Sequence, residues 1–200
     1  MTAAVMPTSP RPVTHLDTVD GARIPVSLQG PEHGRHVVIF DDPEQTTSWH
    51  EAVCRRLHVA RLRTVLITAD RRLTAKSAAG ILDALQVRAA VLVGDQGGGA
   101  LAWELAATYH DRFTGLVVID AGHPRVADVN GVIRDERCPD VHADTTALVS
   151  SCAADAVARA SRRCVHGEFR LRELAGWRGS RHFATQLVTE ILLRRHTWPG

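Results

Sequence analysis

Residues 91–100 read Val-Leu-Val-Gly-Asp-Gln-Gly-Gly-Gly-Ala, and this stretch decides the fold. An apolar, β-branched run ends at Gly94, and the glycine cluster 97–99 opens the amphipathic segment 100–110. This pattern predicts a buried strand, a very tight turn and a helix. The glycines have a mechanical reason, because so sharp a turn needs positive φ and a close approach of two backbones.

Predicted strands and helices alternate on both sides of this stretch. The dipeptide Asp20-Gly21 lies between two extended runs, 13–19 and 22–28, which predicts a β-hairpin. Apolar runs then predict buried strands at 36–40, 64–68, 89–93 and 115–120, and apolar residues at helical spacing predict helices around 49–57, 78–85 and 101–106. Ser48 and Glu51 form a capping box for the first of these helices.

The remaining third of the chain continues the same pattern after one long interruption. Residues 121–143 have no clean period and carry several glycines and prolines, which predicts a loop. A strand at 145–150, a short helix at 155–161, a half-exposed edge strand at 168–174 and a helix at 183–192 follow. This order predicts an α/β fold with a mostly parallel sheet, helices on both faces, and ligands bound beyond the carboxyl ends of the strands.

Composition excludes several classes of protein. The 200 residues are 44% hydrophobic and 23% charged, with a net charge of +2, so nothing favours nucleic acid as a partner. No apolar run approaches the ~20 residues of a membrane helix. Residues 1–12 lack a signal-peptide pattern, so we expect a disordered tail, one domain over 13–200, and a cytoplasmic protein. The four cysteines show no metal-ligand spacing, so we expect reduced thiols, no metal and no cofactor.

The segment Gly94-Asp95-Gln96-Gly97-Gly98 resembles the nucleophile elbow of the α/β-hydrolase superfamily, Gly-x-nucleophile-x-Gly. Other parts of the family pattern follow in the family's order from about Val13 to Leu193. Residues 112–120 resemble the strand after the elbow helix, 148–155 the strand that presents the triad acid, and 179–183 the loop that carries the triad histidine. The resemblance implies an α/β-hydrolase fold with a minimal or absent cap, since only residues 121–143 are available to form one.

The resemblance also assigns site residues. Asp155 falls on the triad acid, with Asp120 as the runner-up, and His182 falls on the triad histidine. We expect Asp155 to lie nearer His182 than Asp120 does. Gln96 falls on the nucleophile, but an amide has no proton to give to a histidine and is not a nucleophile. A shift of the pattern that makes Asp95 the nucleophile would put Val93 where the elbow needs a glycine.

The oxyanion hole that the resemblance implies is incomplete. The backbone N–H of Gly97 would be one donor, and the second would come from the loop beginning Asp41-Asp42-Pro43-Glu44. Pro43 has no N–H, and the neighbouring carboxylates would oppose an oxyanion. At the strand ends we also expect His123 to join Asp41, Asp42, Asp95 and His182, although their spacing is no metal motif.

Two hypotheses follow. The first is a catalytically degenerate α/β-hydrolase that binds a small molecule or a protein partner. The second is an active hydrolase or lyase on a small ester-like or carbonyl substrate, using His182 with Asp155 and a non-standard nucleophile, either Asp95 or water. Because the short cap would leave apolar surface open at the strand ends, we also expect a homodimer or another protein partner there.

Overall fold

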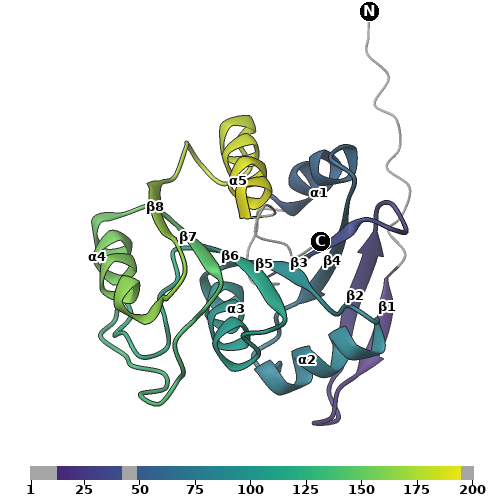
Figure 1. Ribbon diagram of the computed structural model, residues 1–200, viewed down its shortest axis with the longest axis horizontal. Helices are drawn as coiled ribbons and strands as arrows, with labels where there is room; N and C mark the ends of the chain where they lie inside the picture. Colours follow the sequence, from purple (N-terminus) through teal and green to yellow (C-terminus); the bar gives the residue numbers. More distant parts are fainter. Residues whose placement is uncertain (1–12, 42–48, 195–200) are drawn as a thin grey trace, which may run out of the picture.

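The computed structural model describes residues 13–41 and 49–194, and this part of the chain forms an eight-stranded sheet in the order β1-β2-β4-β3-β5-β6-β7-β8 (Figure 1). The first two strands pair antiparallel with each other, β2 pairs antiparallel with β4, and the pairs from β4 to β8 are parallel. The elements are β1 (Thr14–Asp17), β2 (Arg23–Gln29), β3 (Arg35–Asp41), α1 (His50–Val59), β4 (Leu62–Thr68), α2 (Ala75–Ala84), β5 (Ala90–Asp95), α3 (Gln96–Thr108), β6 (Phe113–Ile119), β7 (Asp144–Val149), α4 (Cys152–Ser161), the 3₁₀ turn η1 (Arg162–Cys164), β8 (Phe169–Glu173) and α5 (Arg181–Arg194).

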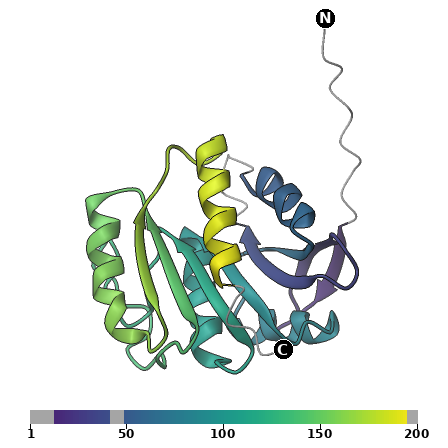
Figure 2. The same ribbon diagram turned by 45° about the horizontal axis from the view of Figure 1, so that its top comes forward.

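Helices cover both faces of the sheet. Helices α1 and α5 lie on one face, and α2, α3 and α4 lie on the other (Figures 1 and 2). Every residue of β5 is buried, because its successive side chains enter the two cores in turn. The continuous apolar run before Gly94 therefore forms a central strand, as its sequence predicts.

The order and type of the predicted elements are confirmed. The Asp20-Gly21 hairpin forms between β1 and β2, and β8 is an edge strand with no fully buried residue. Helix α4 is longer than predicted, since it begins at Cys152 with the Ser151 hydroxyl accepting a hydrogen bond from the Ala154 amide. The tail 1–12 and the capping residue Ser48 lie outside the described residues.

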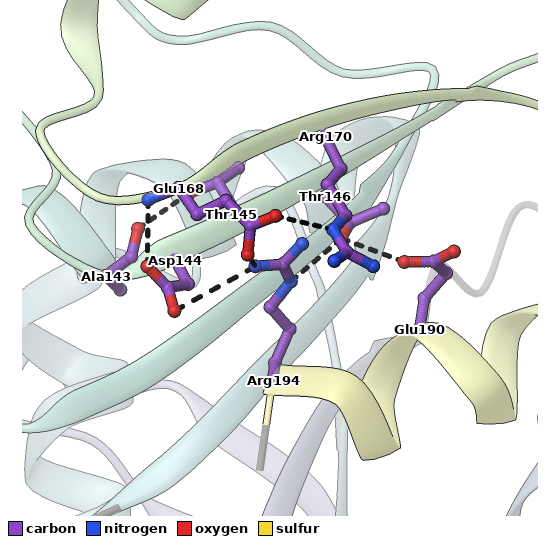
Figure 3. Close-up of polar contacts among 8 residues, drawn as sticks. All are labelled: Ala143, Asp144, Thr145, Thr146, Glu168, Arg170, Glu190 and Arg194. Atoms are coloured by element: carbon purple, nitrogen blue, oxygen red, sulfur yellow. Dashed lines mark hydrogen bonds and ion pairs between the residues drawn. The ribbon is translucent and has the colours of Figure 1, made fainter. Parts of the chain in front are cut away.

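The last helix is fixed to the sheet by a buried arginine at its end. Figure 3 shows the Arg194 guanidinium lying over β7 and the start of β8. Its Nε donates to the Thr146 hydroxyl at 3.0 Å, and its Nη1 donates to the Glu168 carboxylate at 3.0 Å. Thr146 in turn donates to Glu190 of the same helix at 3.2 Å. These contacts fix α5, and with it the preceding loop that reaches the candidate site.

The cap is minimal. Residues 120–143, which join β6 to β7, consist of turns and loops without a helix. Among the described residues, no helix is both long enough and apolar enough to cross a membrane.

Candidate functional site

The elbow forms where the glycine cluster predicts it. Strand β5 ends at Asp95 and helix α3 begins at the next residue, Gln96, so the turn has no linking residue at all. Gln96 lies at the tip with a φ of 45°, in the left-handed region that a side chain disfavours. Its side chain is exposed, as is Gly97 beside it.

Close backbone approach explains two of the elbow glycines. A Cβ at Gly94 would overlap the backbone of Gly98 one turn later, and a Cβ at Gly98 would lie 2.6 Å from the Phe40 carbonyl oxygen on β3. Any larger residue would force the strand and the helix apart. The elbow therefore places Gln96 at the carboxyl end of the central strand.

Behind the tip lies an ion-pair cluster that we call the Arg178 clamp, formed by Arg178, Asp95 and Asp120. The Arg178 Nε and Nη2 donate to the two carboxylate oxygens of Asp95 at 2.5 and 2.9 Å, and Nη2 also donates to Asp120 at 2.5 Å. Asp95 is only 1% exposed. Burial lowers the pKa of the Arg178 guanidinium, but the hydrogen bonds and charges of both carboxylates outweigh burial and raise that pKa above its usual range.

Asp120 extends the clamp to the next strand. It follows β6 and has a φ of 48°, so it is a second residue with a side chain in the left-handed region. Its carboxylate accepts the Ser150 backbone N–H at 2.7 Å and the Ser150 hydroxyl at 2.5 Å. Side chains at the ends of β5, β6 and β7 are thereby joined in one hydrogen-bonded group.

A cavity of about 350 Å³ lies in front of this group, at the carboxyl ends of the strands. Gln96, Gly97, Asp120 and Ser150 form its floor. Its other described lining residues come from the loop 121–134 and from helices α3 and α4, and they include Val126, Val129, Val157 and Arg134. A more open hollow of about 760 Å³ shares Gly97, Ala100, Pro124 and Arg134 with it. The 350 Å³ volume of the first cavity is typical of a small-molecule site.

No protein-family model and no curated protein matches this chain. Solved structures do resemble it. A hydrolase from Pseudomonas aeruginosa PA01 is 17% identical, with a TM-score of 0.73 over 92% of this chain and 98% of that one. The alpha/beta hydrolase domain-containing protein 10 from mouse is 12% identical, with a TM-score of 0.70 over 92% and 99%. Epoxide hydrolase A from Mycobacterium thermoresistibile is 13% identical, with a TM-score of 0.68 over 93% and 98%.

The chain has the α/β-hydrolase fold. The strand order, the elbow after the central strand and these similarities agree on it. At such low identity the likeness extends to the fold alone, so the chemistry has to be argued from the residues in place.

Asp155 and His182, the triad acid and histidine that the resemblance assigns, do not pair with each other in the structure. Helix α5 begins at Arg181, so His182 lies in its first turn, where Phe183 takes the buried position and His182 is exposed. The Asp155 carboxylate pairs instead with Arg159 at 2.6 Å, one turn along α4. Among the described residues no hydrogen bond or ion pair links His182 to Asp155 or to Asp120.

Sequence reasoning missed Arg178, which lies four residues before His182, in the loop that leads into α5. That loop, in this α/β-hydrolase fold, brings a guanidinium to the strand ends. One signal was available: Asp95 ends β5 and Asp120 directly follows the neighbouring parallel strand β6, and a nearby cation stabilises two carboxylates placed side by side. Asp95 was considered as a nucleophile, but the clamp holds both of its carboxylate oxygens.

His123 lies in the cavity wall as predicted, but its ring is already committed. Its Nε2 lies 2.9 Å from the Pro139 carbonyl oxygen, and its Nδ1 accepts the Arg125 backbone N–H at 3.2 Å. A carbonyl only accepts, so Nε2 carries the proton and the ring is neutral. Burial lowers the pKa of His123. The ring also packs edge-on against Trp103, with 5.4 Å between the ring centroids. His123 is therefore a structural histidine rather than a base.

We expect acid to destabilise the protein through His123. Its native pKa is depressed, so the unfolded chain binds this proton at a higher pH, and the stabilisation is present above pH 6.5 and lost as pH falls below it. Burial likewise lowers the pKa of His36 and His58, which act in the same direction. Urea unfolding between pH 7.5 and 5 should show this slope, of at most about 1.4 kcal/mol per pH unit for each proton. The His123→Gln variant should show a shallower slope, and an unchanged slope would contradict the assignment.

The remaining predicted site residues lie at the edge of the site or outside the described part. Asp41 ends β3, and its carboxylate lies 3.3 Å from the buried His50 ring. Asp42, Pro43 and Glu44 lie outside the described residues, so the second oxyanion donor has no described position. Within residues 13–41 and 49–194, no group of three or more His, Cys, Asp or Glu side chains is placed to hold a metal ion.

Proposed function

We propose that this protein is a catalytically degenerate member of the α/β-hydrolase fold that binds a small molecule in the cavity above the elbow. The observation that carries the proposal is Gln96 at the elbow tip, on the floor of that cavity. This position needs a group that can become an alkoxide, thiolate or carboxylate, and a carboxamide can become none of these. The tip geometry and the cavity remain, which supports binding rather than bond cleavage.

The titratable groups in and behind the cavity support the same proposal. A hydrolase needs a base that can accept a proton near neutral pH. The carboxylates of Asp95 and Asp120 are both ion-paired with the permanently charged Arg178 guanidinium. Both ring nitrogens of His123 already make hydrogen bonds. The alternative of an active hydrolase or lyase would therefore depend on the exposed His182 acting on water.

Ester turnover tests the loss of hydrolysis. We expect wild-type protein to give no acyl-enzyme and no turnover of p-nitrophenyl acetate or butyrate above background. The Gln96→Ser variant should recover little, because Pro43, in the loop where the resemblance places the second oxyanion donor, has no N–H, and loss of one donor costs about 10²–10³ in rate. Any residual turnover should disappear in His182→Ala. Robust wild-type turnover with a trapped acyl-enzyme would refute the proposal.

Ligand binding is tested by filling the cavity. Ala154 lines it from the first turn of α4, whereas the neighbouring Ala153 is exposed and does not line it. We expect small polar fragments, screened by saturation-transfer NMR, to bind wild type and Ala153→Phe but not Ala154→Phe. Fragments that bind all three proteins equally, or none, would count against this cavity as the site.

A protein partner is the second candidate, and exposed apolar side chains in the minimal cap favour it. Val129, Val132 and Ile133 are 59, 54 and 45% exposed, and Val129 also lines the cavity. We expect concentration-dependent dimerisation in sedimentation velocity, lost in the double variant Val132→Asp/Ile133→Asp. The control Val59→Asp changes an 82% exposed valine at the end of α1 and should leave dimerisation intact. A monomer at all concentrations would rule out the homodimer.

A further inference from the structure

The Arg178 clamp joins segments that are far apart in the sequence. Asp95 lies 83 residues before Arg178, and Asp120 lies 58 residues before it. Arg178 belongs to the loop between β8 and α5, whereas Asp95 ends β5 and Asp120 directly follows the adjacent strand β6. One guanidinium, 21% exposed, therefore ties this loop to the centre of the sheet.

Both strained residues of the cavity floor adjoin the clamp. Gln96 directly follows Asp95, and Asp120 is itself a member, and these two have φ values of 45° and 48°. A residue with a side chain in the left-handed region costs about 1–3 kcal/mol and persists only where the surroundings fix it. Here the bidentate bond to Asp95 and the third bond to Asp120 supply that fixation.

The clamp also reaches Ser150, on the part of the cavity floor next to α4. Asp120 accepts two hydrogen bonds from Ser150, which precedes the N-cap of α4 and lines the cavity. If Asp120 turned away, Ser150 would lose its backbone and hydroxyl acceptor together. The position of Ser150 thus depends on Arg178 indirectly, through the carboxylate of Asp120.

We propose that Arg178 is the positioning residue of this cavity: it holds the elbow tip at Gln96 and the Asp120–Ser150 pair in the conformation that a ligand meets. It acts through Asp95 and Asp120 and does not itself line the cavity. The role of this positioning in ligand binding rests on the proposed function. The geometry can be tested without any ligand, so a failure of ligand binding and a failure of positioning are separate results.

The backbone amide of Ser150 reports on the clamp. It donates to a carboxylate at 2.7 Å, which shifts its proton NMR signal downfield and protects it from exchange. In Arg178→Met we expect this signal to move upfield and its hydrogen exchange to accelerate by about tenfold or more relative to wild type. Arg178→Lys should fall between the two, because one ammonium cannot make the fork that serves both acids.

A second variant separates positioning from stability. Arg178→Met leaves Asp95 buried without this cation and should lower the Tm by roughly 10 °C, given the cost of a broken buried pair. The double variant Arg178→Met/Asp95→Asn has the same net charge as the wild-type clamp and should regain much of that Tm. It should still show the upfield, fast-exchanging Ser150 amide, because Asp120 remains without its guanidinium partner.

Chemical rescue completes the test. Methylguanidinium chloride at a sub-denaturing concentration should move the Ser150 amide of Arg178→Met back toward its wild-type shift, whereas sodium chloride at equal ionic strength should not. Arg159→Met, which removes an exposed guanidinium paired with Asp155, should leave the Ser150 amide unchanged. A wild-type Ser150 amide in both Arg178→Met and the double variant would overturn the proposal, as would equal rescue by both salts.

Discussion

Gly94→Ala should strongly destabilise the protein, because the added methyl group would overlap the backbone of Gly98 and Gly99. These atoms belong to the first turn of α3 and are fixed by the central strand beside them. To remove this overlap, β5 and α3 would have to move apart, which would disrupt the packing of the core between them. We expect the free energy of unfolding to fall by about 3 kcal/mol or more.

A matched glycine supplies the control for this prediction. Gly80 lies inside α2, and the nearest atom to a Cβ there would be a Val19 methyl carbon at 3.9 Å. Gly80→Ala should therefore leave the fold intact and raise the free energy of unfolding by up to about 1 kcal/mol, through helix propensity. Urea unfolding followed by tryptophan fluorescence measures both variants. Equal effects from the two substitutions would mean that close approach at the elbow is not the constraint.

The second large effect should come from Trp103, the largest fully buried side chain in the described part of the chain. It packs against His123, and its Nε1 donates to the Ala121 carbonyl at 3.1 Å, so it supports the cavity wall from beneath. Trp103→Ala should lower the free energy of unfolding by about 3–5 kcal/mol. Trp103→Phe keeps most of the packing but leaves the Ala121 carbonyl without this donor, at about 1–3 kcal/mol.

Trp177 is the control for Trp103. Its side chain is 69% exposed, so Trp177→Ala should change the free energy of unfolding by less than about 0.5 kcal/mol. Chemical denaturation of the three variants at a single pH allows direct comparison. A loss at Trp177 as large as that at Trp103 would contradict the burial argument.

The fold could be predicted from the sequence because its signals are local. The β-branched run before Gly94 and the glycines after it specify a buried strand and a sharp turn without reference to distant residues. The signals for the hairpin at Asp20-Gly21 and for the edge strand within residues 168–174 are equally local, and both elements are confirmed. The resemblance to a known family supplied the strand order, which such patterns alone leave open.

The candidate site was less predictable because it depends on tertiary contacts. The position of His182 depends on where α5 begins, and a shift of one residue turns a helical side chain by about 100°. The pairing of Asp155 with Arg159 was visible as an i,i+4 spacing on a predicted helix. The contacts of Arg178 with Asp95 and Asp120 could not be predicted, because nothing in the sequence near Arg178 indicates which acids it pairs with.

The long sequence separation within the clamp has a consequence for the order of assembly during translation. Chains emerge from the ribosome N-terminus first, and strands β5 and β6 are complete about sixty residues before Arg178 is added. Until then the carboxylates of Asp95 and Asp120 end neighbouring strands without their shared guanidinium, and their like charges repel. The cavity floor therefore acquires its Arg178 contacts only when the loop before α5 has been synthesised.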